Sequence, residues 1–359
     1  MAVAENHGGI STALKLVDIE GKGRGLVASQ PVKGGQIVLR DSPILTYSSF
    51  SLKQRQGVYS RYCGHCYKLL VTGNGTLACP TCSHPDDAIF CSSKCQSSAL
   101  GFSHTPWVCQ SLSYLRNCPV LVDQQPEDRQ IQARYLVAAF NLAMVSPSSF
   151  QTLISLDGGG PQGGERDFNA AIFLHPIISS LPFPEGLSAP SLDITAALLS
   201  KDRCNAFGLM EPLTEHGERS VRAYAIYRNA SFFNHDCLPN ACRFDYVDGG
   251  TEGNTDMIIR MIHDVPEGRE ICLSYFPVNF SYPQRQKRLL DDYGFSYGEN
   301  NEIELDGDDD FPHTYFFVRF VCDKENCGGT LAPLPPSNYN NTTNVMECNA
   351  CGSLKKEEL

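Results

Sequence analysis

Eight potential zinc ligands lie within the 47 positions from Cys63 to Cys109, and this array constrains the fold more than any other feature. Each neighbouring pair has the spacing of a metal-binding knuckle, in which a tight turn or one helical turn brings two side chains to one ion. Eight ligands make two closed tetrahedral sites, which stabilise a fold but leave no open position for catalysis. The pairs are Cys63-x2-Cys66, Cys79-x2-Cys82, Cys91-x3-Cys95 and His104-x4-Cys109.

The chain has 16 cysteines, so disulfides are the alternative to metal binding. The first residues, Met1 to Ser11, have neither a basic nor an apolar stretch, and we therefore expect no signal peptide. No run of the sequence approaches the roughly 18 apolar residues of a membrane span. Thiols inside the cell stay reduced, CxxC pairs rarely form good disulfides, and a histidine falls in register. These observations favour zinc.

Composition is that of a globular protein, and 359 residues predict two or three domains with a sizeable core. The formal net charge of −11 argues against tight nonspecific binding to DNA or to anionic membranes. The same charge suits a basic peptide as partner.

Patterning predicts short strands near both ends of a central helical region. A loop is expected at 158–164, and the acidic stretch 299–310 is expected to be a solvated linker. Asp193 is expected to cap a helix that runs through Ser200. The other predicted helices are 128–146 and 283–293, and the predicted strands are 14–19, 25–28, 36–40, 257–262 and 270–275.

A second, simpler cysteine cluster lies near the end of the chain. Its spacing predicts a zinc ribbon that holds one ion, with free thiols as the alternative. Glycines follow both knuckles and let backbone amides turn toward sulfur. The four ligands are Cys322, Cys327, Cys348 and Cys351.

The segment Gly23-Arg24-Gly25-Leu26-Val27-Ala28 matches GxGxxA, a form of the dinucleotide-binding fingerprint. That fingerprint needs a helix directly after it, and here Pro31 and Gly34-Gly35 interrupt any helix. We therefore expect a loop between two strands. Its glycines either serve a turn or allow close backbone approach to a small ligand.

Three motifs together resemble one known family. Asn234-His235-Asp236-Cys237-Leu238-Pro239-Asn240 resembles the NHxCxPN signature of SET-domain lysine methyltransferases, and Pro266–Tyr275 resembles their PxGxE…Y strand. Gly23-Arg24-Gly25 resembles their opening loop, and the array at 63–109 resembles a MYND zinc finger placed inside the SET domain. The order of these motifs is similar to that of the SET-and-MYND family, plant-type members above all, over residues 13–296.

The resemblance implies an α+β chain: a β-rich SET fold with a pseudoknot, split by the MYND finger and a helical insert, and followed by a C-terminal zinc ribbon. The implied domains are the first SET part at 13–50, the finger at 55–112, the helical insert at 113–203, the SET core at 204–296, the acidic linker at 297–311 and the ribbon-like segment at 312–353.

The family pattern also implies roles for single residues. Tyr275 and Tyr293 match tyrosines that line the lysine channel, and Phe207 matches a channel aromatic. The implied zinc pairing is interleaved, with Cys63, Cys66, Cys91 and Cys95 on one ion and Cys79, Cys82, His104 and Cys109 on the other, although spacing alone also allows a sequential pairing. The residues implied to bind S-adenosylmethionine are Lys22, Gly23, Arg24, Gly25, Asn205, Ser231, Phe233, Asn234, His235 and Phe295.

The sequence departs from the family at the segment after Tyr293. The cysteines of the usual post-SET cluster are missing there, so Cys237 lacks its expected zinc partners. Two interpretations of Cys237 stay open: a buried free thiol, or a ligand to which the C-terminal cysteines fold back. The pair His104-x4-Cys109 is also one residue longer than the usual spacing.

Two functions are therefore predicted. The first is S-adenosylmethionine-dependent methylation of a lysine in a histone or another protein, on a basic segment. The second is a catalytically weak or inactive scaffold in which the finger and the C-terminal ribbon recruit protein partners, and the resemblance implies that the finger binds proline-containing peptides. The finger is not notably basic, which disfavours direct DNA binding. We expect a monomer in the nucleus or cytoplasm, without membrane attachment.

Overall fold

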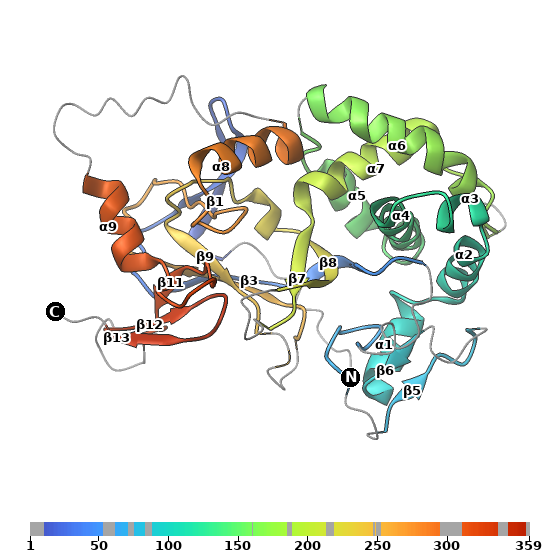
Figure 1. Ribbon diagram of the computed structural model, residues 1–359, viewed down its shortest axis with the longest axis horizontal. Helices are drawn as coiled ribbons and strands as arrows, with labels where there is room; N and C mark the ends of the chain where they lie inside the picture. The colour runs from blue at the N-terminus through green and yellow to red at the C-terminus, as the bar shows by residue number, and fades with distance from the viewer. Residues whose placement is uncertain are drawn as a thin grey trace.

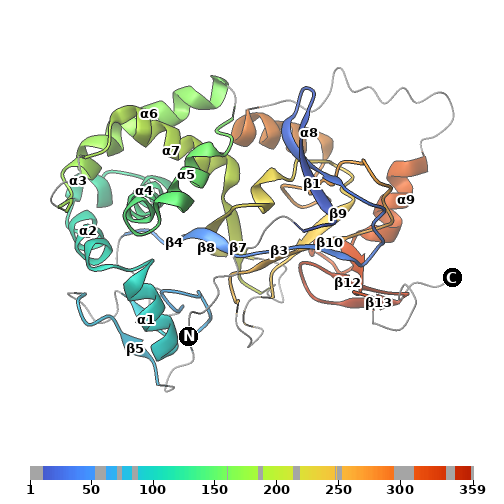
Figure 2. The same ribbon diagram turned by 180° about the vertical axis from the view of Figure 1, so that it is seen from behind.

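The structure is a computed structural model that describes residues 11–52, 62–70, 75–82, 88–159, 161–184, 189–212, 219–246, 248, 253–294, 311–336 and 344–356. Figures 1 and 2 show two main parts, a helical part formed by α2–α7 and a part rich in strands, with the cysteine-rich finger projecting beside the helices. The mixed helix and sheet content confirms the predicted α+β class.

Strands from the two ends of the chain pair with each other and build the strand-rich part. A hairpin of β1 (Leu14–Ile19) and β2 (Gly23–Ala28) opens the chain. Strand β3 (Ile37–Asp41) then pairs with β10 (Met257–Met261), which also pairs with β9 (Ala241–Phe244). Strand β4 (Pro43–Ser48) pairs with β8 (Val221–Tyr227), beside β7 (Phe207–Met210). The chain segments before and after the long insert between β4 and β7 therefore fold together into one domain.

The predicted pseudoknot lies where the segment 270–273 runs between two other segments. On one edge, the Ile271 amide donates to the Leu26 carbonyl of β2 at 2.8 Å. On the other edge, the Leu273 amide donates to the Asn234 carbonyl at 3.0 Å, and the Asp236 amide donates back to Leu273 at 2.9 Å. Buried apolar side chains of all three segments, Leu26, Phe233, Ile271 and Leu273 among them, share one core. A short 3-10 turn, η3 (Ala230–Phe232), leads into the crossing.

The helical insert packs its own core against β4. The predicted helix 128–146 is confirmed as α4 (Glu127–Val145), and its residues Tyr135 and Leu136 are fully buried. The other helices are α2 (Pro106–Arg116), α3 (Pro119–Val122), α5 (Pro147–Ser155), α6 (Pro161–Ser179) and α7 (Leu192–Asn205).

Three sequence predictions about this region and the knot were wrong in detail. Helix α7 is capped by Ser191, whose side chain accepts from the Ile194 amide at 3.2 Å, and it continues past Ser200 to Asn205. The loop expected at 158–164 ends early, because α6 begins at Pro161, a residue suited to the first helical turn. The segment 270–275 makes isolated bridges and no regular strand, because its partners on the two edges run in different directions.

Two cysteine-rich modules complete the chain. The finger contains β5 (Leu77–Ala78), β6 (Ile89–Phe90) and α1 (Ser93–Gly101). The C-terminal module contains α9 (Phe311–Phe320), β11 (Leu331–Pro333), β12 (Val345–Cys348) and β13 (Leu354–Lys356). Before it, the predicted helix 283–293 is present as α8 (Tyr282–Arg288), extended by a π-helical turn, η4 (Leu289–Tyr293). The acidic stretch 299–310 lies outside the described residues.

Candidate active site and metal centres

The opening glycine loop meets the Asn-His motif directly. Gly23 has φ +76°, which a turn into β2 requires and which glycine adopts without strain. A Cβ atom on Gly25 would lie 2.7 Å from Asn234 Nδ2, and the Asn234 side chain donates to the Arg24 carbonyl at 3.4 Å. The loop thus serves a turn at Gly23 and a close approach at Gly25.

Glu270 stabilises this contact, and the sequence analysis assigned no role to this residue. Its carboxylate accepts from Asn234 Nδ2 at 2.9 Å and from Lys22 Nζ at 2.8 Å. Burial lowers the pKa of Lys22 as the largest single effect, but the hydrogen bond and the charge of Glu270 together raise it above its ordinary value. Lys22 therefore stays cationic at neutral pH. Glu270 is the last residue of the PxGxE run Pro266–Glu270, and this place in the motif was the available signal in the sequence.

His235 and Tyr275 form the centre of the site. The Tyr275 amide donates to His235 Nδ1 at 3.1 Å, so the neutral ring carries its proton on Nε2, which lies 3.4 Å from Cys237 Sγ. Burial first, and then the charges of Arg285 and Lys22, lower the pKa of His235 to about 3. His235 is therefore a neutral, structural hydrogen-bond partner at neutral pH.

The two predicted channel tyrosines lie side by side. The rings of Tyr275 and Tyr293 are 4.7 Å apart, and the Tyr275 hydroxyl donates to the Phe233 carbonyl at 2.9 Å. Burial raises the pKa of Tyr275 and raises that of Tyr293 to about 12. Both phenols stay protonated at neutral pH and can orient a neighbouring group without acting as strong bases.

Phe207 stands at the start of β7, beside the other end of the site. Its ring packs edge-on against Tyr227 at 5.6 Å, and the guanidinium of Arg243 lies 5.7 Å from its centroid. Ser231 donates to the Tyr227 carbonyl at 2.8 Å, which ties the η3 turn to the same strand. Arg243 gave no sequence signal, because only the fold brings it to β7.

The end of α7 and the segment 155–159 close the site from the helical side. Asn205 is buried, and its Nδ2 donates to the Asp157 carbonyl at 2.7 Å. Arg24 donates to the Ser155 carbonyl at 2.6 Å and stacks over Phe232 at 4.9 Å. The structure thus brings Asn205 and the glycine loop to one segment. Phe295, the remaining predicted cofactor residue, lies outside the described residues.

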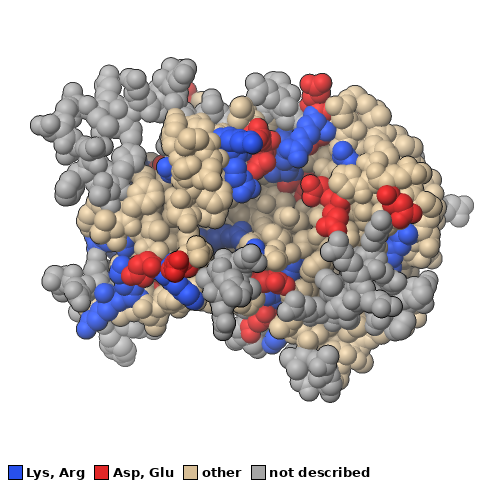
Figure 3. All heavy atoms as spheres, viewed as in Figure 1, with Lys and Arg blue, Asp and Glu red and all other residues tan. Residues whose placement is uncertain are grey.

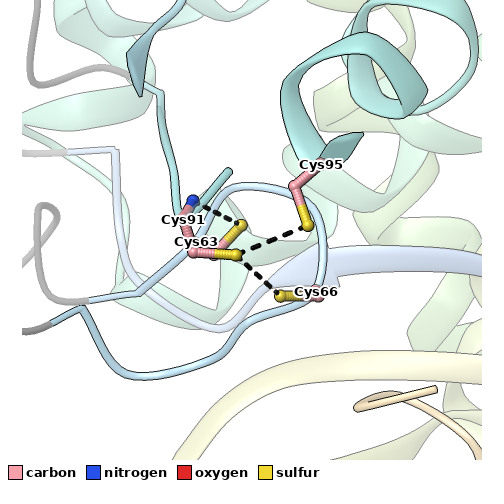
Figure 4. A group of neighbouring side chains, drawn as sticks. All are labelled: Cys63, Cys66, Cys91 and Cys95. Carbon is pink, nitrogen blue, oxygen red and sulfur yellow. Dashed lines mark hydrogen bonds between the residues drawn. The ribbon is translucent and has the colours of Figure 1, made fainter. Parts of the chain in front are cut away.

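All 16 cysteines lie in the described part of the chain, and none of them forms a disulfide there. Twelve residues gather in three groups of four, whose ligand atoms lie within 4.8 Å of one another in each group. The finger groups are interleaved, as the family pattern implied, and Figure 4 shows the first. The groups are Cys63, Cys66, Cys91 and Cys95; Cys79, Cys82, His104 and Cys109; and Cys322, Cys327, Cys348 and Cys351.

Spacing between sulfur atoms tests whether these groups fit a metal ion. Zinc–sulfur bonds of about 2.3 Å place two thiolates of a tetrahedron about 3.8 Å apart. The measured separations are 3.7 Å for Cys66–Cys91, 3.6 Å for Cys79–Cys109 and 3.8 Å for Cys322–Cys351. Each group could therefore hold one tetrahedral ion.

Cys237 stands apart from these groups. It is only partly buried, and the four C-terminal cysteines gather without it. Of the two interpretations, the one in which those cysteines fold back to Cys237 is wrong, and the thiol instead lies beside His235 Nε2. Burial raises the pKa of the Cys237 thiol, so it stays protonated at neutral pH.

A cavity of about 500 Å³ lies away from these residues, between the finger and β4. Its walls include Cys66, Cys91 and Cys95 of the first group, the β4 residues Ile44 and Thr46, and none of the predicted cofactor-binding residues. Within the described ranges, no helix is long and apolar enough to cross a bilayer.

A SET-type architecture is defined by two contacts: the segment 270–273 crosses the Asn-His segment, and the glycine loop lies over this crossing. The profile of the SET domain matches residues 23–276. The chain is 48% identical to histone-lysine N-methyltransferase ASHR2 of Arabidopsis thaliana, over 99% of this chain and 98% of that protein. The chain belongs to the SET-domain family, as its motifs predicted.

More distant relatives match over part of their length. N-lysine methyltransferase SMYD2-B of Xenopus laevis is 25% identical over 79% of this chain and 59% of its own length. Among solved structures, the SET domain of LSMT bound to lysine and AdoHcy aligns with a TM-score of 0.35 and 15% identity, over 82% of this chain and 55% of that one.

Proposed function

We propose that this protein transfers the methyl group of S-adenosylmethionine to the side-chain amine of a lysine in another protein. The observation that carries the proposal is the contact among Gly25, Asn234 and Glu270, directly beside the Tyr275–Tyr293 pair. A glycine loop that approaches an asparagine side chain this closely brings the backbones of both segments together, where they can line one small-molecule site. The relatives named as lysine methyltransferases support the same activity.

The cofactor would lie between the glycine loop and the Asn-His segment. Lys22, Gly23, Arg24 and Gly25 would hold it from one side, and Ser231, Phe233, Asn234 and His235 from the other. Asn205, which already contacts the segment at Asp157, would close the site. The buried neutral His235 fixes the Tyr275 backbone, because its Nδ1 accepts from that amide.

The chemistry requires alignment more than covalent work. The sulfonium of the bound cofactor supplies the electrophilic methyl group. Phe207, Tyr275 and Tyr293 would confine the lysine stem in line with it, and such orientation lowers the barrier strongly. Loss of the lysine proton at pH 7.4 costs about 4 kcal/mol from a reference pKa of about 10.4. An apolar channel beside a positive charge reduces that cost, so neither tyrosine needs to act as the base.

Metal ions would stabilise the fold without entering the reaction. We propose three zinc ions per chain, two in the finger and one in the C-terminal module, because each group offers four ligands and no open position. Elemental analysis of the purified protein tests the count, and two ions would remove the C-terminal site from the proposal.

The decisive experiment combines calorimetry with turnover. Full-length protein is titrated with S-adenosylmethionine and assayed with labelled cofactor on histones and on whole-cell extract. Tyr275→Phe removes one hydroxyl from the site, and we expect kcat to fall at least tenfold while cofactor affinity is kept. The matched control is Tyr282→Phe, an exposed tyrosine on α8, which should leave kcat unchanged. Full turnover in the Tyr275 variant would refute its assignment, and absence of cofactor binding would refute the activity.

A second function is favoured by one observation. The 500 Å³ cavity between the finger and β4 offers a site for a peptide, and β4 lines it as an edge strand of its sheet. In this alternative the chain is a scaffold that captures proline-containing peptides. A peptide array over the full-length protein tests it, and capture by a protein that binds no S-adenosylmethionine would favour the scaffold.

A further inference from the structure

We propose that the C-terminal module braces the lysine channel, and that Asn349 is the positioning residue through which it acts. This inference rests on the proposed function, because that function identifies Phe207, Tyr275 and Tyr293 as the lysine channel. The contacts between the module and these segments do not depend on it. The module lies beside β9 and β10 (Figure 2), and by two separate routes it contacts the strand that presents Phe207 and the segment that follows Tyr275.

The first route runs through Asn349, which lies inside the Cys348–Cys351 knuckle. Its Nδ2 donates to the Arg243 carbonyl of β9 at 3.1 Å. Its own position is fixed from within the module, because its Oδ1 accepts from the Thr330 amide at 2.8 Å and its backbone amide donates to the Thr330 carbonyl at 3.0 Å. A rigid knuckle therefore holds the backbone of Arg243.

Arg243 carries this constraint to the channel. Its guanidinium donates to the Gly208 carbonyl at 2.7 Å and lies 5.7 Å from the centroid of the Phe207 ring. It also lies 3.7 Å from Asp245, which keeps its charge partnered. Since β8 is the only sheet partner of β7 among the strands that the structure describes, Arg243 is a second, independent tether for the strand that presents Phe207.

The second route runs through the segment that follows Tyr275. Val278, three positions after Tyr275, is 2% exposed and belongs to the same buried cluster as Phe316, Phe320 and Met346 of the module. Beside it, Gly328 lies so close to Asn279 that a Cβ atom on Gly328 would be 2.7 Å from Asn279 Oδ1. The module thus packs against residues 276–281, the chain segment that links Tyr275 to the α8–η4 helix carrying Tyr293.

The orientation of the module is locked by a buried ion pair. Arg260 of β10, whose side chain is 1% exposed, donates to Glu347 of β12 at 2.9 Å and lies 3.6 Å over the Phe244 ring. Tyr246 donates to the same Glu347 carboxylate at 3.0 Å. Because the module is held in place by these contacts, it can fix the positions of the channel residues that it contacts. A displacement of about 1 Å at a reacting centre is enough to lower turnover strongly.

The test replaces Asn349 by Ala in the full-length protein, with Asn254→Ala as the matched control. Asn254 makes the same two kinds of bond at the finger: its Nδ2 donates to the Cys66 carbonyl at 2.7 Å, and its Oδ1 accepts from the Asp248 amide at 2.7 Å. The two variants thus lose equivalent hydrogen bonds at the two cysteine-rich modules. Metal content, cofactor affinity, kcat and KM, and hydrogen exchange by mass spectrometry are measured for both.

We expect Asn349→Ala to keep the metal content and cofactor affinity of the wild type. Exchange of amides in 207–210 should rise about tenfold, because a tether of β7 is lost, and kcat/KM for protein substrate should fall roughly fivefold. Asn254→Ala should change neither quantity. Arg243→Lys, which keeps the charge but shortens the reach to Gly208, should reproduce the effect if Asn349→Ala folds poorly.

Unchanged exchange at 207–210 in both Asn349→Ala and Arg243→Lys would overturn the brace. An equal loss of turnover in Asn254→Ala would overturn it as well, because the effect would then belong to general destabilisation. The exchange measurement does not depend on turnover. A wild type that methylates nothing, combined with faster exchange at 207–210 in the variants, would therefore refute the proposed function and still support the brace.

Discussion

The finger and the C-terminal module have the same kind of ligand group but are embedded in the molecule in different ways. The buried cluster of the finger, taken with the partly buried residues packed against it, consists only of residues between Cys63 and Cys109, seven of them cysteines. The C-terminal module has no such private core within the described residues, because its cysteines share one with Phe244, Ile262 and Val278 of the SET part. Equal ligand spacing therefore does not imply an equal structural role.

Their attachments differ in the same sense. The finger is joined to the SET part by polar contacts to its backbone, such as Arg222 to the Tyr67 carbonyl at 3.0 Å and Asn254 to the Cys66 carbonyl, and by the buried side chain of Tyr67, which belongs to the SET core. The C-terminal module adds an apolar interface and the buried Arg260–Glu347 pair. We infer that the finger is an appended module and that the C-terminal module is part of the SET core.

The largest expected effect comes from removing one metal ligand in each module. Cys79→Ser should cost the finger a metal ion, and with it an apparent ~10–16 kcal/mol that folds so small a segment. Finger amides should then lose their exchange protection, while the β3–β10–β9 sheet keeps its own. Cys348→Ser, at a position 1% exposed in the shared core, should instead lower the main unfolding transition.

Mass spectrometry of intact protein and hydrogen exchange measure both variants, and a serine at the unliganded Cys118 provides the control for the substitution itself. If Cys79→Ser lowers the main transition as much as Cys348→Ser does, the distinction between the two modules fails.

Sequence reasoning was strongest where chemistry is local. Short ligand spacings predicted three groups of four, and the family pattern gave the interleaved pairing of the finger. The knot motifs also identified the residues that meet, because Gly25 and Asn234 belong to recognisable segments. Periodicity located α4 to within one residue at each end, although the helix is buried around most of its circumference between Ala133 and Leu142.

What the sequence could not predict depends on contacts between distant segments. Glu270 becomes the common partner of Lys22 and Asn234 only when the knot closes. Arg243 reaches Gly208 because β9 and β7 belong to different sheets that meet at the site. Helix α7 begins at Leu192 because the hydroxyl of Ser191, the residue before it, accepts from the Ile194 amide, and Asp193 therefore lies in the first turn instead of at the cap. Cysteine spacing gave no information about what surface a ribbon packs against.

A smaller effect is expected from neutralising the buried pair that locks the C-terminal module. Glu347→Gln leaves the Arg260 charge buried beside a neutral amide, and breaking such a pair costs about 3–5 kcal/mol. The control is Asp323→Asn, which removes the exposed Lys355–Asp323 pair of the same module and should cost under about 1 kcal/mol. Urea denaturation of both variants measures the difference. Equal midpoints would show that the module is attached as loosely as the finger.

The smallest expected effect uses pH to separate the two sides of the molecule. In the helical part, Asp202 of α7 accepts a hydrogen bond from the Tyr47 hydroxyl of β4. Burial above all, with the charge of Asp167 adding to it and the Tyr47 bond opposing it, raises the pKa of Asp202 to about 7. An unfolded aspartate titrates near 3.9, so the folded state holds the extra proton between these values.

Stability from this group is therefore fully present below about pH 4 and is lost as pH rises through about 7. Between pH 5.5 and 8 the loss should be on the order of 2 kcal/mol. Asp202→Asn keeps an acceptor for Tyr47 and should flatten this slope, whereas Glu347→Gln, on the side of the C-terminal module, should leave it unchanged. Calorimetric melting of the three proteins at both pH values measures the slopes. The same slope in Asp202→Asn as in the wild type would mean that the titrating group lies elsewhere and that pH does not distinguish the two sides.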